Sequence, residues 1–195
     1  MKSIYSEMNE QTKEKIQSNF LQLLQNKHFM NITVRDLTTQ AKINRGTFYL
    51  HYVDKYDLLA QMEDSLLDGL ELHLQRIKPQ DMLLVAQKGE IPTLSIEVFR
   101  YIQENAHLFE AFLGANNLSG FQKRLKQFFM NHFVQKMEQN REFFNHVTIP
   151  QDYFSSFAIS AFLGLIEQWL ENNLTETPEE MANMYIQIIF FIKKI

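Results

Sequence analysis

Apolar side chains recur every three or four residues along almost the whole chain, and no long stretch alternates apolar and polar residues. The first spacing gathers apolar side chains on one face of an α-helix, whereas alternation would indicate a β-strand. The longest apolar stripe runs from Leu58 to Ile77. The pattern therefore restricts the chain to an all-α fold.

The same spacing predicts about nine helices. Three of the four prolines stand at the start of a predicted helix, where a missing N–H costs little. Thr177 and Glu180 are spaced for a capping box at the start of the last helix, and residues 78–91 are predicted to form a connection. The predicted helices span residues 8–26, 33–40, 44–50, 54–77, 92–103, 105–113, 118–140, 151–172 and 178–194.

The composition excludes several classes of protein. A chain of 195 residues without cysteine has no disulfide scaffold, no cysteine-ligated zinc site and no thiol nucleophile. The sequence has no HExxH, Walker A or GxSxG motif, and its histidines lack metal-ligand spacing, so we expect neither an enzyme nor a bound metal or cofactor. No apolar run approaches the roughly 18 residues of a membrane span, and no signal peptide is visible, so a cytoplasmic location is expected.

The net charge of −4 conceals an asymmetry along the chain. Residues 1–58 carry 8 basic and 6 acidic side chains, whereas the remainder carries 11 basic and 17 acidic side chains. A mildly basic N-terminal segment on an acidic body is compatible with DNA contact by one end of the protein.

Residues 31–58 hold the most informative local pattern. Thr33 and Asp36 are spaced to cap a short helix, a turn follows near residues 42–43, and Asn44 is placed to cap a second short helix. Two short helices joined by a tight turn, after an amphipathic helix, are the parts of a helix-turn-helix. The second helix of this motif inserts its N-terminal residues into the major groove of DNA.

The side chains of this segment suit DNA contact. Arg45 can reach guanine or a phosphate, and Gly46 allows a close approach of the backbone. Lys55, at the start of the long helix, is predicted to bind a phosphate. From physical chemistry alone, solvated surface charges and hydrogen-bonded surface aromatics explain these residues equally well. The candidate DNA contacts are Thr33, Asn44, Arg45, Gly46, Thr47, Tyr49, His51 and Lys55.

Residues 12–59 closely resemble the DNA-binding domain of the TetR family of bacterial transcriptional regulators. The match departs from the common pattern at Asn44, where serine is frequent, and at Tyr52, where phenylalanine is frequent. The resemblance implies a helix-turn-helix domain over 1–53 and a helical ligand-binding and dimerisation domain over 54–195. The residues that carry it are Ile32-Thr33-Val34-Arg35-Asp36-Leu37, Ala41, Arg45-Gly46-Thr47-Phe48-Tyr49-Leu50-His51-Tyr52, Lys55 and Asp57-Leu58-Leu59.

The C-terminal part of the chain is rich in aromatic residues at helical spacing, Phe157 among them. Such residues can line an apolar pocket between helices, and the family places a ligand pocket here. For any single phenylalanine, a place in the core is the better explanation. The candidate pocket residues are Phe99, Tyr101, Phe109, Phe112, Phe128, His132, Phe162 and Trp169.

The last two predicted helices carry a signal for dimerisation. Small residues recur every four positions on the first of them, and the second presents a broad apolar face. A helix-turn-helix that reads a palindrome needs twofold symmetry, which favours a homodimer over an isolated core helix. The candidate interface residues are Ser156, Ser160, Gly164, Met184, Ile188 and Phe191.

These observations predict a homodimeric repressor that an unidentified small, mostly apolar molecule releases from operator DNA. One alternative keeps DNA binding but makes the protein an activator or a co-repressed regulator. A second alternative is a helical protein-interaction adaptor, which the DNA-contact residues from Arg45 to Lys55 argue against.

Overall fold

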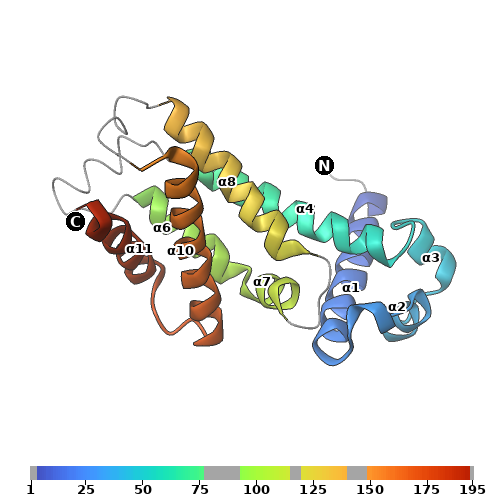
Figure 1. The fold of residues 1–195 in the computed structure, drawn as a ribbon. Helices are drawn as coiled ribbons and strands as arrows, with labels where there is room; N and C mark the ends of the chain where they lie inside the picture. The colour runs from blue at the N-terminus through green and yellow to red at the C-terminus, as the bar shows by residue number, and fades with distance from the viewer. Residues whose placement is uncertain (1–3, 77–92, 115–119, 140–148, 194–195) are drawn as a thin grey trace. The chain divides into compact units, whose positions relative to one another are not determined.

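The computed structural model describes residues 4–76, 93–114, 120–139 and 149–193 (Figure 1). Over these residues the chain forms nine α-helices and one short 3-10 helix, with no strand. The all-α prediction is confirmed. The chain divides into two compact units: unit 1 comprises Met1–Leu66 and His107–Phe121, and unit 2 comprises Leu67–Ala106 and Gln122–Ile195.

Unit 1 is built around a three-helix arrangement of α1 (Ile4–Asn26), α2 (Val34–Gln40) and α3 (Arg45–Tyr49) (Figure 1). The 3-10 helix η1 (Phe29–Asn31) joins α1 to α2. The first part of α4 (Lys55–Leu74) and most of α7 (Ala106–Leu113) complete the unit. Its helices bury their apolar stripes together, and the buried side chains include Ile16, Phe20, Leu24, Phe29, Ile32, Leu37, Phe48, Tyr52 and Leu58.

Unit 2 contains the second part of α4 and four further helices. An aromatic cluster forms its core, because Phe162 of α10 lies 4.8–5.4 Å, between ring centroids, from Phe99, Phe129 and Tyr185. Trp169 lies against Phe99 and donates its indole N–H to the Glu176 carbonyl at 2.9 Å. The four helices are α6 (Thr93–Glu104), α8 (Phe121–Gln139), α10 (Gln151–Glu171) and α11 (Pro178–Lys193).

The observed helix boundaries lie close to the predicted ones. The largest difference is in α1, which begins at Ile4 rather than at residue 8, and η1 was not predicted. The capping box of Thr177 and Glu180 is present, with both backbone N–H groups bound by the opposite side chain. The predicted connection 78–91 lies outside the described residues, and the domain boundary after residue 53 stays a prediction.

Candidate nucleic-acid interface

A tight turn fixes how α3 follows α2 in unit 1. The Ile43 N–H donates to the Thr38 carbonyl at 3.0 Å, which is the bond of a Schellman motif. The motif places Lys42 in the left-handed region, with φ of 50°. Two helices joined through one left-handed residue give the compact geometry of a helix-turn-helix.

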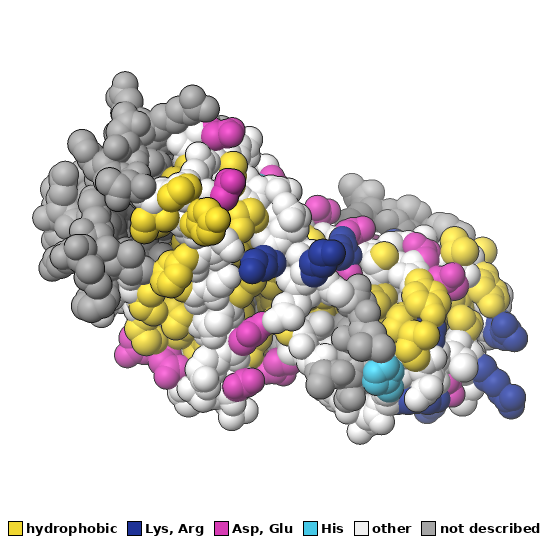
Figure 2. Space-filling model, in the orientation of Figure 1, with side chains coloured by type: hydrophobic (Ala, Val, Ile, Leu, Met, Phe, Trp, Pro, Cys, Tyr) yellow, Lys and Arg dark blue, Asp and Glu magenta, His cyan; other side chains and the backbone are white. Residues whose placement is uncertain are grey.

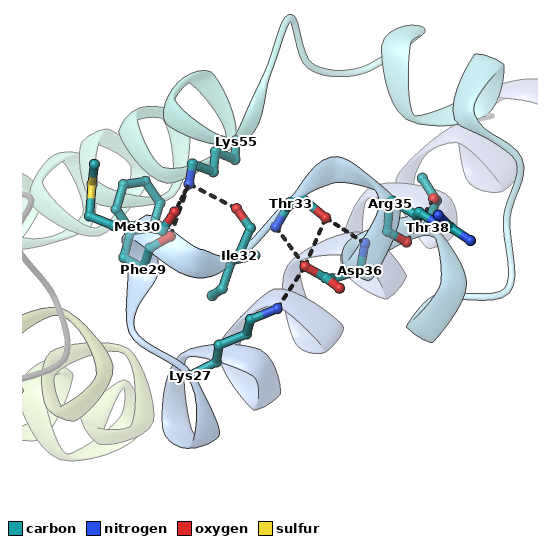
Figure 3. Close-up of polar contacts among 9 residues, drawn as sticks. All are labelled: Lys27, Phe29, Met30, Ile32, Thr33, Arg35, Asp36, Thr38 and Lys55. Carbon is teal, nitrogen blue, oxygen red and sulfur yellow. Dashed lines mark hydrogen bonds and ion pairs between the residues drawn. The ribbon is translucent and has the colours of Figure 1, made fainter.

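The start of α2 carries the predicted capping box (Figure 3). Thr33 Oγ1 accepts from the Asp36 N–H at 3.1 Å, and the Thr33 N–H donates to the Asp36 carboxylate at 2.8 Å. Lys27, which directly follows α1, donates to the same carboxylate at 2.9 Å. Hydrogen bonds from Lys27 and then from Thr33 lower the pKa of Asp36 to about 2, so the carboxylate holds α1 and α2 together across the neutral pH range.

Asn44 caps α3, as predicted. Its Oδ1 accepts from the Thr47 N–H at 3.2 Å and from the Thr47 hydroxyl at 3.0 Å. Both side chains therefore take part in starting the helix, and Asn44 is exposed whereas Thr47 is half-buried. The α3 residue that faces inward is Phe48, which is completely buried.

The outward side of α3 presents Arg45, Gly46 and Tyr49, and all three are exposed. The Arg45 guanidinium donates to the Tyr49 hydroxyl at 3.1 Å, one helical turn along. His51 follows the helix and is half-buried, and burial, with a smaller effect of the positive charge of Lys13, lowers its pKa. A neutral imidazole offers a phosphate a hydrogen bond and no ion pair.

Lys55 lies where the sequence predicted a phosphate contact, but its ammonium group is engaged within the protein (Figure 3). It donates to the carbonyl oxygens of Phe29, Met30 and Ile32 at 3.0, 3.0 and 2.8 Å. An ammonium group has three N–H donors, so these three bonds use all of them. The ammonium also lies 4.8 Å from the ring centroid of Phe29. We call this arrangement the Lys55 clamp; it joins the start of α4 to the η1–α2 connection.

The first turn of α4 also differs from a phosphate site. The Asp54 carboxylate accepts from the N–H groups of Tyr56 and Asp57, each at 2.8 Å. The Asp57 carboxylate accepts from the Val53 N–H at 2.8 Å, and hydrogen bonds from Gln61 and Val53 lower its pKa. The Asp54 carboxylate therefore already binds two of the N–H groups at the start of α4 that an anion would use. In this structure Lys55 thus has a structural role, and its phosphate contact stays a prediction.

Sequence reasoning missed two apolar side chains next to α3. Leu50 is 81% exposed and Val53 is 78% exposed, although both stand within a largely apolar stretch. Leu50 is two residues from buried Phe48 and two from buried Tyr52, and on a helical turn that offset directs a side chain away from the core. This offset is the signal that could have identified Leu50.

The predicted pocket residues fall into separate groups. Phe99, Phe162 and Trp169 belong to the closely packed core of unit 2. Phe109 and Phe112 pack on Phe121 within unit 1. The eight residues are thus divided between two units, and their common pocket stays a prediction.

The remaining three pocket candidates are polar or partly exposed residues of unit 2. His132 Nε2 lies 2.9 Å from the Glu71 carboxylate, and its ring lies 4.7 Å from Phe128. Tyr101 packs against His73 at 5.2 Å, and burial raises its pKa. Across the described residues, no three acidic or histidine side chains gather as metal ligands.

The predicted dimer residues lie partly on an exposed face of unit 2. Ser160 and Gly164 of α10 are exposed, Ser156 is half-buried, and Lys126 donates to the Ser160 hydroxyl at 3.2 Å. Figure 2 shows apolar side chains gathered over α10. Phe157, one of the aromatic residues at helical spacing, is 51% exposed on this helix.

On α11, Met184 is half-buried and Ile188 is 36% exposed. The side chain of Phe191 lies outside the described residues.

A search of the described helices for membrane spans finds none with the length and hydropathy that crossing a bilayer requires.

Comparison with known families finds matches in both parts of the chain. Residues 90–190, more than half of the chain, match the family model of a transcriptional regulator C-terminal region of the TetR type. Residues 21–62 match the model of bacterial regulatory proteins of the tetR family.

Individual relatives share the fold at low sequence identity. The chain is similar to the uncharacterized HTH-type transcriptional regulator YxbF of Bacillus subtilis (strain 168), with 22% identity over 93% of this chain, and spans 46% of that protein's length. A TetR transcriptional regulator from Streptococcus agalactiae 2603V superposes with a TM-score of 0.65 and 20% identity, covering 95% of this chain and 97% of that one. The dihydroxyacetone kinase operon activator DhaS superposes with a TM-score of 0.59 and 14% identity, covering 94% and 96%.

Proposed function

Because the chain belongs to the TetR family of transcriptional regulators, we propose that its α3 enters the major groove of an operator and that the bound protein represses transcription. The outward side of α3 carries the proposal, since it offers hydrogen-bonding side chains around a glycine that the fold does not require. On this proposal Asn44, Arg45 and Thr47 contact bases, and the flanking side chains Thr33, Tyr49 and His51 position the helix.

The fold of the protein without DNA gives no reason for a glycine at position 46. Its φ lies outside the left-handed region, and a Cβ there would meet only Asn44 Oδ1, at an ordinary 3.6 Å. Alanine is the better helix former by up to about 1 kcal/mol. Glycine also allows the backbone of another molecule to approach closely, and we propose that this molecule is DNA.

The first prediction is specific binding of DNA with twofold symmetry. Selection from random duplexes, followed by footprinting beside the protein's own gene, should yield two half-sites about 10 bp apart or a small multiple of it. Transcription from that promoter in vitro should fall when the protein is added. Gly46→Ala should unfold at the same or a higher temperature, yet bind the selected site more weakly than the wild type.

Two results would contradict this prediction. If the promoter is protected no better than random DNA, the protein does not bind a specific operator there. Wild-type affinity in Gly46→Ala would show that no DNA backbone approaches α3 at this residue.

A second copy of the chain is the partner we propose for the exposed face of α10. Tyr153 and Phe157 are 74% and 51% exposed there, and Ser160 and Gly164 continue the same side of the helix without bulk. Large apolar side chains next to small ones let two helices pack closely. A twofold dimer would also pair two copies of α3 for a palindromic operator.

Gly164→Leu tests this dimer. A Cβ at Gly164 meets no atom within 4 Å, so the larger side chain should leave the protomer folded while it blocks a close helix crossing. Analytical ultracentrifugation should show a monomer, and operator affinity should fall with the loss of the dimer. Lys123→Leu puts the same side chain on an exposed position of α8 and should remain dimeric. A dimeric Gly164→Leu protein with intact DNA binding would place the interface elsewhere.

For regulation, we propose that a small, mostly apolar ligand binds unit 2 and lowers the affinity for the operator. The supporting residues are the pocket candidates that lie in unit 2, whereas Phe109 and Phe112 lie in unit 1. Helix α4 contributes residues to both units, so a shift of this helix would couple ligand and DNA. By linkage, operator DNA would weaken ligand binding by the same factor.

The activator alternative is supported by one similar structure, because DhaS is described as an operon activator. The transcription assay separates the two functions, since an activator raises the amount of transcript and a repressor lowers it. In either case we propose a cytoplasmic, non-catalytic protein that works without a metal or cofactor.

A further inference from the structure

At the start of α3, Asn44 and Arg45 offer another molecule hydrogen-bond donors and no acceptor. Both bonds that Asn44 Oδ1 accepts come from Thr47, so the amide of Asn44 has only its N–H groups left for another molecule. Arg45 supplies donors alone. Residues 44–49 contain no aspartate or glutamate. A side chain that reads cytosine or makes a bidentate contact with adenine needs an acceptor, which this helix lacks at Asn44 and Arg45.

Arg45 is also held in one orientation by its own helix. Its Nη2 donates to the Tyr49 hydroxyl at 3.1 Å, and the guanidinium lies over the Tyr49 ring at 5.8 Å from the centroid. The Tyr49 ring is in turn packed edge-on against buried Phe48, at 5.6 Å and 83°. The Tyr49 ring and hydroxyl therefore favour one orientation of the guanidinium, and Arg45 retains further N–H donors for a base.

We propose that each half-site contains a guanine that Arg45 reads through O6 and N7, and that Tyr49 is the positioning residue that sets the guanidinium for this contact. The inference rests on the proposed DNA-binding function. It adds which base is recognised and which two residues, Arg45 and Tyr49, recognise it. Guanine presents two acceptors in the major groove, which match two parallel N–H donors of arginine. Holding the guanidinium in advance lowers the entropy lost on binding.

The test measures discrimination rather than affinity. Dissociation constants are compared for the selected operator with guanine, with adenine and with 7-deazaguanine, which lacks the N7 acceptor, at the position concerned. The wild type should prefer guanine over adenine by roughly 5- to 150-fold. Arg45→Ala should lose this preference, and Tyr49→Phe, which keeps the ring but removes the hydroxyl, should lose part of it. Tyr49→Phe should have no further effect in the Arg45→Ala background.

Tyr56→Phe is the matched control. Tyr56 is 51% exposed in the same unit, and its hydroxyl contacts the Met30 sulfur at 4.0 Å, away from α3. This variant should keep the full guanine preference. Thermal unfolding of each variant checks that unit 1 remains folded, so that a changed ratio reports on recognition.

Several outcomes would overturn the inference. If Tyr49→Phe weakens binding to all three DNAs equally, Tyr49 acts on the backbone and not through Arg45. If Arg45→Ala keeps the preference, another residue reads the guanine. In both cases specific DNA binding, and with it the proposed function, still stands. If random-sequence selection enriches no site at all, the proposed function fails together with the inference.

Discussion

Lys55→Met is expected to lower the free energy of unfolding by about 2–4 kcal/mol. Hydrogen bonds to charged groups contribute roughly 1.5–3 kcal/mol each, and partial solvent exposure reduces the total from the three bonds of the Lys55 clamp. Methionine replaces the apolar stem of lysine as far as Cε and lacks only the ammonium group, so the loss reports mainly on that group. Urea unfolding followed by circular dichroism measures it.

Lys27→Met is the control for this prediction. Its ammonium group forms a partly exposed ion pair with Asp36, so its loss should cost about 1 kcal/mol or less. The alternative role of Lys55 is tested by DNA binding at several salt concentrations. Loss of a phosphate contact would reduce the slope of log K against log salt by about 1. A Lys55→Met protein with wild-type stability and this smaller slope would contradict the Lys55 clamp and restore the phosphate contact.

Gly69→Ala should be destabilising in the wild type and stabilising when Tyr101 is absent. A Cβ at Gly69 would lie 2.0 Å from the Tyr101 hydroxyl oxygen and 2.5 Å from Cζ, so the ring would have to leave its place beside His73. Overpacking of this kind costs about 1–3 kcal/mol. In the Tyr101→Ala background the space is free, and the higher helix propensity of alanine should gain up to about 1 kcal/mol.

The informative result is that the effect of Gly69→Ala on the free energy of unfolding changes sign between the two backgrounds. This comparison is independent of the cost of Tyr101→Ala itself. A double-mutant cycle from urea unfolding gives the coupling between the two residues. If Gly69→Ala stabilised both backgrounds equally, Tyr101 would be able to move aside freely. The contact would then not hold α4 against α6 within unit 2.

The features predicted correctly from the sequence depend on neighbours in the chain. Thr33 with Asp36, Asn44 with Thr47 and Thr177 with Glu180 each act over three residues, so their spacing alone predicts a helix start. The helix boundaries were predicted closely because they too depend on residues that are near in the sequence. The early start of α1 was missed, although serine, a preferred N-cap residue, directly precedes Ile4 in the sequence.

The features that were missed depend on distant parts of the chain. Lys55 binds carbonyl groups 23 to 26 residues away, and a basic residue at a helix start carries no local sign of such partners. The packing of Phe109 on Phe121 is likewise decided by tertiary structure. Phe157 shares its spacing with buried neighbours, and only the side of α10 that it occupies distinguishes it.

The double duty of Asn44 limits how the preference of this protein for DNA could be changed by directed evolution. Replacing Asn44 alters the groups next to the major groove and also removes the cap of a helix only five residues long. A library at this position retains a cap only with serine, threonine, aspartate or glycine. Arg45 has no such duty, so it accepts all side chains at little cost to folding. New specificities should therefore be sought first at Arg45, with Asn44 varied only within the capping set.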